Sequence, residues 1–154
     1  MSSPSPASDL QRQDAVLVLL AVAGSSAACT ARGDLPTAHV LQAYYALAAD
    51  ATRATGGRVI KVIGDGVLLT FPIGRAREAV SALQGMQRES AKLWTAFDPG
   101  CRVQLKMGAG PVVAGTMGPP DDQRFDVYGD TLNRLFKMPP EEFLISPEVR
   151  ALLS

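Results

Sequence analysis

The hydrophobic positions along the chain follow two periods, which predict alternating strands and helices. Residues 15–22 are almost continuously apolar, which is typical of a strand buried on both faces. After them, Asp34 or Thr37 can cap a helix that Gly56-Gly57 would end. The packing face of this helix, read from its spacing, consists of Leu41, Tyr44, Tyr45, Ala48 and Thr52.

The middle of the chain predicts a hairpin followed by a second helix. Strands over 58–63 and 67–71 flank Gly-Asp-Gly, and Asp-Gly is a strong signal for a hairpin turn. A helix follows over about 75–95. Its apolar side is formed by Ala76, Val80, Leu83, Met86 and Leu93.

The last third predicts further strands and a short helix. Residues 101–107 and 111–117 read as a second pair of strands around the glycine turn Gly-Ala-Gly. A helix over 130–138 is stopped by Pro139-Pro140. The remaining predicted elements are a short strand at 124–129, a strand at 142–146 and a helical turn at 147–153.

This order of elements predicts an α+β fold. The helices return to one mostly antiparallel sheet, and the opening βαββα portion is ferredoxin-like, leading to a βαββαβ core. Residues 14–154 form the predicted domain, while residues 1–13 are rich in Ser and Pro and read as a disordered leader. A chain of 154 residues suffices for one such domain with a core.

Charge and cysteine content exclude several classes of protein. Basic and acidic residues both number 15, so the net charge is zero, which argues against nucleic acid or an anionic membrane as the main partner. Cys29 and Cys101 stand apart, with no metal-ligand spacing, and indicate a reducing, cytoplasmic setting.

The apolar run also invites a second interpretation. Followed by small residues and a Cys, residues 15–22 resemble the core of a secretory signal. However, Asp9 and Asp14 flank Arg12, so the positive charge of a signal is missing. The run is also too short to span a bilayer, and we predict no membrane span. A buried strand is therefore favoured.

A few polar residues interrupt the apolar pattern and are candidates for chemistry. Lys61 alternates with Val59 and Ile63 on one strand face, so it either extends from a sheet edge or points into a site. Asp126 lies within the apolar stretch Phe-Asp-Val-Tyr, where it satisfies a backbone amide or faces a ligand. Together with Asp65 in the hairpin turn and with Asn133 and Lys137, four apart on one helix face, these residues are able to surround a phosphorylated ligand.

Two stretches resemble the catalytic domain of class III adenylate/guanylate cyclases. They are GGRVIKVIGDGVLLTFP at 56–72 and GPVVAGTMGPPDDQRFDVYGDTLNRLFKM at 110–138, in the right order and spacing. The resemblance runs from about residue 15 to the end of the chain. The order of strands and helices predicted above agrees with the fold of that family.

The resemblance implies a specific chemistry. In these enzymes two aspartates hold two divalent metals, Mg²⁺ or Mn²⁺, which activate the ribose 3′-hydroxyl and clamp the triphosphate. A Lys and an Asp read the base, while an Asn and an Arg on a helix orient the ribose and stabilise the pentavalent phosphorus. These groups come from two chains, so the resemblance also implies a dimer.

Four of these roles transfer to matching residues. Asp65 corresponds to the metal ligand in the hairpin, and Asn133 to the ribose-orienting Asn. Lys61 and Asp126 correspond to the pair that reads the base. This pair suits adenine, because Lys donates to N1 and the carboxylate accepts from the exocyclic amine, whereas guanine presents the opposite pattern.

Three departures from the family pattern concern the metals and the phosphate. Ala21, three residues before Gly24, stands where the first strand should carry the other metal-binding Asp. Lys137 stands at the position of the Arg and keeps its charge but not its bidentate fork. The segment after Lys137 is short, and Leu135-Phe136 replace smaller residues.

The sequence thus leaves three functions open. The first is a degenerate cyclase domain that acts through dimerisation or through binding ATP or another adenine nucleotide. The second is an active adenylate cyclase that makes cyclic AMP and pyrophosphate as a homodimer. The third is a heterodimer, in which this chain supplies the base-reading half and an intact cyclase chain supplies both aspartates.

Overall fold

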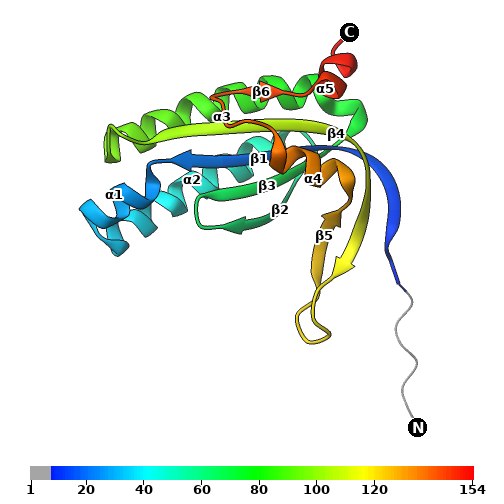
Figure 1. The fold of residues 1–154 in the computed structure, drawn as a ribbon, viewed down its shortest axis with the longest axis horizontal. Helices are drawn as coiled ribbons and strands as arrows, with labels where there is room; N and C mark the ends of the chain where they lie inside the picture. Colours follow the sequence, from blue (N-terminus) through cyan, green and yellow to red (C-terminus); the bar gives the residue numbers. More distant parts are fainter. Residues whose placement is uncertain (1–7) are drawn as a thin grey trace.

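A computed structural model describes residues 8–154 of the chain (Figure 1). Its elements, in order, are β1 (Gln11–Ala23), α1 (Ser25–Arg32), α2 (Asp34–Ala54), β2 (Arg58–Ile63), β3 (Gly66–Pro72), a 3₁₀ turn (Ile73–Arg75), α3 (Ala76–Phe97), β4 (Arg102–Met117), β5 (Arg124–Tyr128), α4 (Asp130–Lys137), β6 (Leu144–Ile145) and α5 (Pro147–Leu152).

The strands within the described residues form one sheet with the order β2-β3-β1-β4-β5. All pairs along this path are antiparallel, and the short β6 pairs with β4 in parallel. The predicted α+β architecture with a mostly antiparallel sheet is therefore confirmed.

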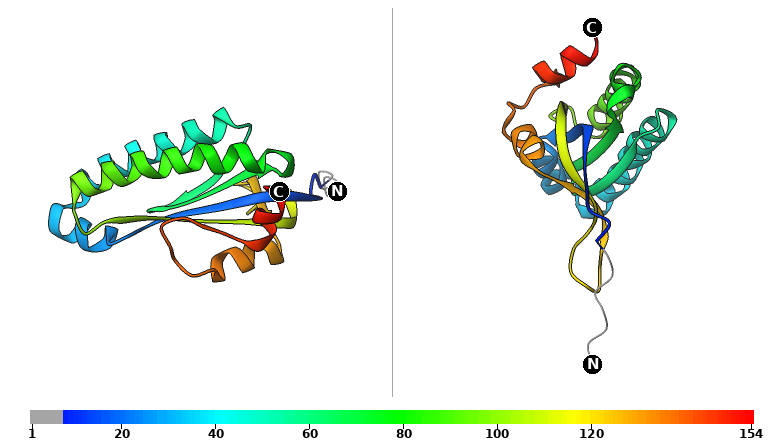
Figure 2. Two further views of the ribbon diagram at one scale, coloured as in Figure 1. Left: turned by 90° about the horizontal axis from the view of Figure 1, so that it is seen from above. Right: turned by 90° about the vertical axis from the view of Figure 1, so that its right-hand side faces the viewer.

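Helices cover both faces of the sheet. α2 and α3 lie side by side on one face, and α4 lies on the opposite face (Figure 2). Alternate residues of β1 serve the two layers: Val16 and Val18 belong to the larger core beneath α2 and α3, and Leu17 to the smaller core beneath α4. β1 is therefore a central strand buried on both faces, as its continuous apolar run predicts.

The start of β1 corrects the predicted leader boundary. Residues 1–7 of that leader lie outside the described residues, but residues 11–13 belong to β1 and pair with residues 112–114 of β4. Just before the strand, the Asp9 carboxylate accepts hydrogen bonds from the backbone N–H and the hydroxyl of Thr116, both at 2.7 Å. These bonds fix the chain against β4 before β1 begins.

The second predicted hairpin is wrong, because β4 is one continuous strand. It pairs with every residue of β1, from Gln11 opposite Ala114 to Ala23 opposite Arg102. The glycines predicted as a turn lie inside this ladder and beneath α4. A Cβ at Gly110 would lie 2.6 Å from Thr131 Oγ1, so this glycine provides close packing of the helix rather than a reversal of the chain.

The helix α1 was not predicted. Its residues are small and polar and only Ala28 is buried, so its sequence has no apolar face with helical spacing. Gly33, with φ 100°, separates α1 from α2. The prediction therefore placed the first helix at the start of α2 and missed the turn of the chain that precedes it.

No helix within residues 8–154 is both long enough and apolar enough to cross a bilayer.

Substituting Gly110 with alanine, which adds a single methyl group, tests its role in packing. Gly110→Ala should lower the free energy of unfolding by about 1–3 kcal/mol, because the added Cβ meets Thr131 unless α4 moves and because the φ of 155° at this position is strained for a residue with a side chain. Urea unfolding measures the change. Gly74→Ala is the matched control, since no atom lies within 4 Å of its added Cβ, and it should shift stability by about 0.5 kcal/mol or less. Equal unfolding midpoints for the two variants would contradict the packing role.

Candidate functional site

The turn between β2 and β3 is held firmly against α2. The hydroxyl of Tyr44 donates to the backbone carbonyl of Asp65 at 3.0 Å, and that of Tyr45 donates to the carbonyl of Gly64. Burial, and then the charge of Asp65, raise the pKa of Tyr44, so its hydroxyl remains a proton donor. The helix therefore fixes the position of the turn that carries Asp65.

The Asp65 carboxylate is directed to the end of β1. Its Oδ2 accepts hydrogen bonds from the Val22 N–H at 2.9 Å and the Ser25 hydroxyl at 3.0 Å. The Val22 amide directly follows Ala21, so residue 21 and the turn are neighbours, as the resemblance implies. Gly24 makes this arrangement possible: its φ of 87° turns the chain into α1, and an added Cβ would lie 2.6 Å from a backbone oxygen.

These residues do not fit a site for two metal ions. Asp65 supplies one carboxylate, and one of its oxygens already accepts two hydrogen bonds. Ala21 offers no ligand atom from its side chain. Within residues 8–154, no group of three or more His, Cys, Asp or Glu side chains is placed to hold a metal. A cation here would have Asp65 as its only carboxylate ligand.

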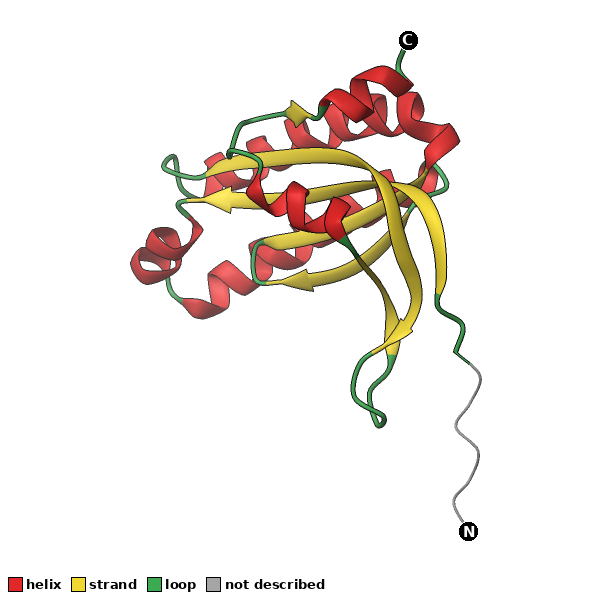
Figure 3. Ribbon diagram, turned by 45° about the vertical axis from the view of Figure 1, so that its right-hand side comes forward, coloured by secondary structure: helices red, strands yellow, loops and turns green. Residues whose placement is uncertain are grey.

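Lys61 and Asp126 are in direct contact, although they lie on opposite edge strands of the sheet. Lys61 Nζ is 3.0 Å from Asp126 Oδ2, and the two side chains are 42% and 28% exposed. Asp126 Oδ1 accepts from the Val127 N–H at 2.8 Å. Beside this pair, the Arg58 guanidinium lies 3.7 Å above the ring of Phe125. The two contacts hold β2 next to β5, which with the end of β4 extends from the sheet as an arm (Figure 3).

A β-bulge in β2 directs Lys61 toward this contact. Val59 pairs with Leu69, but Lys61 pairs with Leu68, which leaves Ile60 as an extra residue. Leu69 belongs to the core beneath α2 and α3, whereas Leu68 belongs to the core beneath α4. Lys61 therefore lies on the opposite face from Val59, and the predicted shared face is wrong because simple alternation does not hold across a bulge.

Asn133 and Lys137 lie on α4, as predicted. Asn133 is half-buried, Lys137 is exposed, and their four-residue spacing places them on one face of the helix. Among residues 8–154, no hydrogen bond or ion pair joins either of them to Lys61, Asp65 or Asp126. One chain thus groups Lys61 with Asp126, holds Asp65 against β1, and presents Asn133 and Lys137 separately.

Two contributors were missed by the sequence analysis. Ser25 donates to Asp65, and Lys106 of β4 donates to backbone carbonyls at the end of α4. Ser25 has no local signal, because only the fold brings it to the turn. The sequence does contain a signal for Lys106. Like Lys61, it is a lysine between apolar residues of a strand, here the buried Leu105 and Met107.

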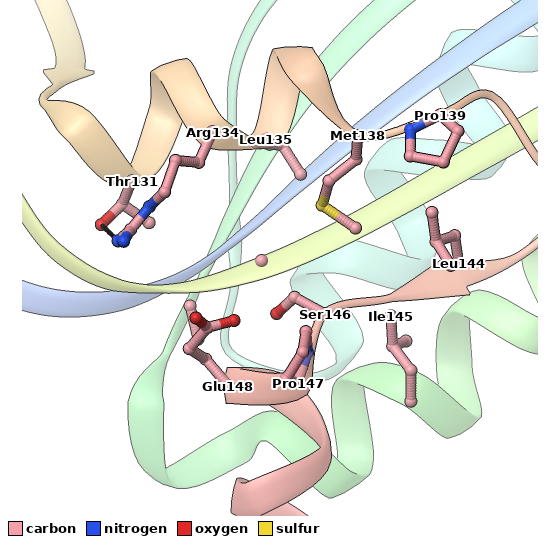
Figure 4. A pocket seen from close by; sticks show the side chains of 12 residues that line it. Thr131, Arg134, Leu135, Met138, Pro139, Leu144, Ile145, Ser146, Pro147 and Glu148 are labelled. Atoms are coloured by element: carbon pink, nitrogen blue, oxygen red, sulfur yellow. Dashed lines mark hydrogen bonds between the residues drawn. The ribbon is translucent and has the colours of Figure 1, made fainter.

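A separate apolar cavity of about 310 Å³ lies on another side of α4 (Figure 4). Leu135 of α4 and Met138, which follows the helix, line one wall, and Leu144 and Ser146 line the other. The lining does not include the candidate site residues Lys61, Asp65, Asp126, Asn133 and Lys137. The cavity therefore shares a helix with the candidate site but does not contain its chemistry.

Comparison with known proteins identifies the family. Residues 9–153 match the family model described as the adenylate and guanylate cyclase catalytic domain. Adenylate cyclase 2 of Rhizobium meliloti (strain 1021) is 24% identical over 129 residues, which is 79% of this chain and 35% of that protein. The chain thus spans about a third of the length of this curated relative.

Solved structures of cyclases share the fold. The adenylyl cyclase CyaB from P. aeruginosa superposes with a TM-score of 0.85 at 18% identity, covering 94% of this chain and 82% of that one. The guanylyl cyclase Cya2 gives 0.83 at 20% identity, covering 94% and 80%. With the family model matching nearly the whole chain, this protein belongs to the class III adenylate and guanylate cyclase catalytic domain family.

Proposed function

We propose that this chain is an adenylate-type cyclase domain in cyclic nucleotide signalling that binds an adenine nucleotide but is impaired in catalysis. The carrying observation is a contrast between two parts of the site. Lys61 and Asp126 are 3.0 Å apart, while Ala21, which precedes the Val22 amide bound to Asp65, has no side-chain ligand atom. The base-reading half is kept and the metal-binding half is reduced.

The proposed adenine recognition uses both members of the contact. Lys61 Nζ donates to N1, and Asp126 Oδ2 accepts from the exocyclic amine, so the base separates two groups that face each other in the free chain. Because Asp126 Oδ1 is held by the Val127 amide, the carboxylate keeps its orientation when Lys61 turns to the base. Partial exposure of both side chains leaves them accessible to a ligand.

The proposed impairment follows from charge. A triphosphate and divalent cations require carboxylates to hold the cations, and this chain offers Asp65 alone. The loss of one carboxylate costs several kcal/mol of transition-state stabilisation, or about 10³-fold in rate. Lys137 retains a positive charge for the phosphate but not the two parallel donors of Arg. Mg²⁺ or Mn²⁺ remains the expected cofactor of any residual activity.

Dimerisation is part of the proposal. Large apolar side chains are exposed around the candidate residues: Ile63, before the Asp65 turn, is 75% exposed, Tyr128 at the end of β5 is 59% exposed, and Phe136 on α4 is 50% exposed. Each of the three adjoins or lies within two residues of a candidate residue in the sequence, and the family resemblance implies that these candidate residues meet at a dimer interface. A second copy of the chain is the proposed homodimer partner.

The proposed setting is the cytoplasm, which the free cysteines support.

The alternative is an active adenylate cyclase, alone or in a heterodimer with an intact cyclase chain. Its support is that Lys61, Asp65, Asp126 and Asn133 all keep the residue types that the family uses. A partner with both aspartates would then complete one working site with the base-reading half of this chain.

Removal of Lys61 tests the proposed recognition. Lys61→Ala should weaken ATP binding about tenfold and reduce the preference for ATP over GTP, because the donor to N1 is lost. Isothermal titration with both nucleotides measures this. Lys92→Ala is the control, since Lys92 is also exposed and ion-paired, with Glu89, but lies on α3. Unchanged ATP affinity in Lys61→Ala would reject the adenine-binding role.

Restoring the missing carboxylate tests the impairment. Ala21→Asp should raise cyclic AMP formation from ATP and Mn²⁺ by about 10³-fold, whereas Ala21→Asn, of similar shape but uncharged, should not. Cyclic AMP is measured after incubation of each purified protein. Robust product from the unaltered chain would contradict the impairment and favour the alternative. Product that forms only after mixing with an intact cyclase would favour the heterodimer.

A further inference from the structure

Lys106 occupies an unusual position in the middle of the sheet. It lies on β4 between the buried residues Leu105 and Met107, and it pairs with Leu19 of β1 on one side and with Leu144 of β6 on the other. Leu19 packs against the core beneath α4, so Lys106 lies on the face of β4 that α4 covers. A charge on this face needs a partner.

The partner is the end of α4. Lys106 Nζ donates to the backbone carbonyls of Phe136 at 3.1 Å and Met138 at 2.9 Å. The last carbonyls of a helix lack intrahelical donors and require other partners. Among the ion pairs of the described residues none involves Lys106, so its ammonium serves backbone oxygens rather than a carboxylate.

Two prolines make this cap necessary. In a continuing helix the carbonyls of Leu135 and Phe136 would accept from the amides of residues 139 and 140, but both are Pro and have no N–H. Leu135 accepts from the Met138 N–H at 3.2 Å instead. Within residues 8–154, no backbone N–H donates to the Phe136 carbonyl in this way, and Lys106 of β4 supplies the donor.

The electrostatics of the contact agree with this role. A cation at the C-terminal end of a helix interacts favourably with the helix dipole. Lys106 is half-buried, and this burial lowers the pKa of its ammonium. The two carbonyl oxygens replace the lost water contacts and hold the ammonium beneath the last turn of α4.

We propose that Lys106 is a positioning residue for nucleotide binding, which it supports by fixing the last turn of α4. Lys137 lies between the two residues whose carbonyls Lys106 holds, and Asn133 lies one turn earlier on the same face. The inference rests on the proposed function, in which Lys137 meets the phosphates. Lys106 thus acts through Lys137 without touching the ligand.

The face of β4 beneath α4 explains how one residue fixes the helix. Gly110 admits Thr131 at the start of α4, Gly108 lies beneath Leu135 in its middle, and Lys106 reaches its end. Figure 4 shows α4 along this strand, with Thr131 toward one end and Met138 toward the other. The glycines allow the helix to approach the strand closely, and Lys106 binds the carbonyls of its last turn.

The test compares ligands with and without phosphates. Lys106→Met keeps the length of the side chain and removes its donors. It should lower the affinity for ATP about tenfold and leave that for adenosine within about twofold, since adenosine meets Lys61, Asp126 and Asn133, which lies a turn before the residues that Lys106 holds, but has no phosphates for Lys137. Lys106→Arg should recover most of the ATP affinity. Lys92→Met, an exposed lysine on α3, is the control and should change neither.

Hydrogen exchange gives a second readout that needs no ligand. The amides of residues 135–138 should exchange about tenfold faster in Lys106→Met than in the unaltered chain, while those of α2 should not change. Unchanged exchange together with unchanged ATP affinity overturns the inference. An equal loss of affinity for ATP and adenosine also overturns it, because Lys106 would then act only on general stability.

The failure of the proposed function would be distinguishable. If the unaltered chain binds neither ATP nor adenosine, nucleotide binding is wrong, and the role of Lys106 in it falls too. Faster exchange in Lys106→Met would in that case still establish the cap on α4, and unchanged exchange would remove the cap as well.

Discussion

The antiparallel pairing of β1 with β4 is the constraint on which the rest of this domain depends. Thirteen consecutive residues of β1, from Gln11 to Ala23, pair with β4 without a break. From residue 15 to residue 20, their side chains alternate between the core beneath α2 and α3 and the core beneath α4. Because a slip of one residue would exchange these faces, the ladder fixes the register of both layers at once. It also fixes the place where β1 ends, and hence the position of Ala21 beside the Asp65 turn.

The candidate site residues lie at the edge strands of the sheet and at the end of β1. Asp65 is held by α2 and by the end of β1, while Lys61 and Asp126 meet where the two edge strands approach each other. The β2 bulge and the arm of β4 and β5 are the irregular features that bring these edge residues together. Irregular backbone at a functional site is a common device, because it re-aims a side chain without disturbing the core. Here the irregular features serve the proposed base-reading half.

The proposed metal-binding half of the site, around Asp65, is held by regular elements of the fold. Asp65 keeps its position, but its carboxylate is satisfied by the chain's own Val22 amide and Ser25 hydroxyl. A carboxylate with such partners remains ordered without a cation. The turn that carries Asp65 is therefore held by contacts within the chain, which agrees with the separation of fold from activity in the proposed function.

The sequence by itself determined the fold class and most of the strands and helices, and it named the candidate residues of the proposed site. The spacing of hydrophobic residues sufficed to predict β1, α2 and α3, because each element buries side chains within its own local sequence. The motifs around Asp65 and Asp126 sufficed for the family, which the match over residues 9–153 confirms. The helix α1 escaped because small and polar residues carry no periodic signal.

Only the tertiary structure decided three further points. The glycines of β4 signal a turn locally, yet α4 packs on them and the strand continues. Lys61 shares a face with Val59 by alternation, yet the bulge reverses it. Lys106 reads as one more strand residue, yet it caps a helix that begins 24 positions later. In each case the outcome depends on a contact between two separate elements of the fold. The local sequence pattern does not indicate which element will pack against a given residue.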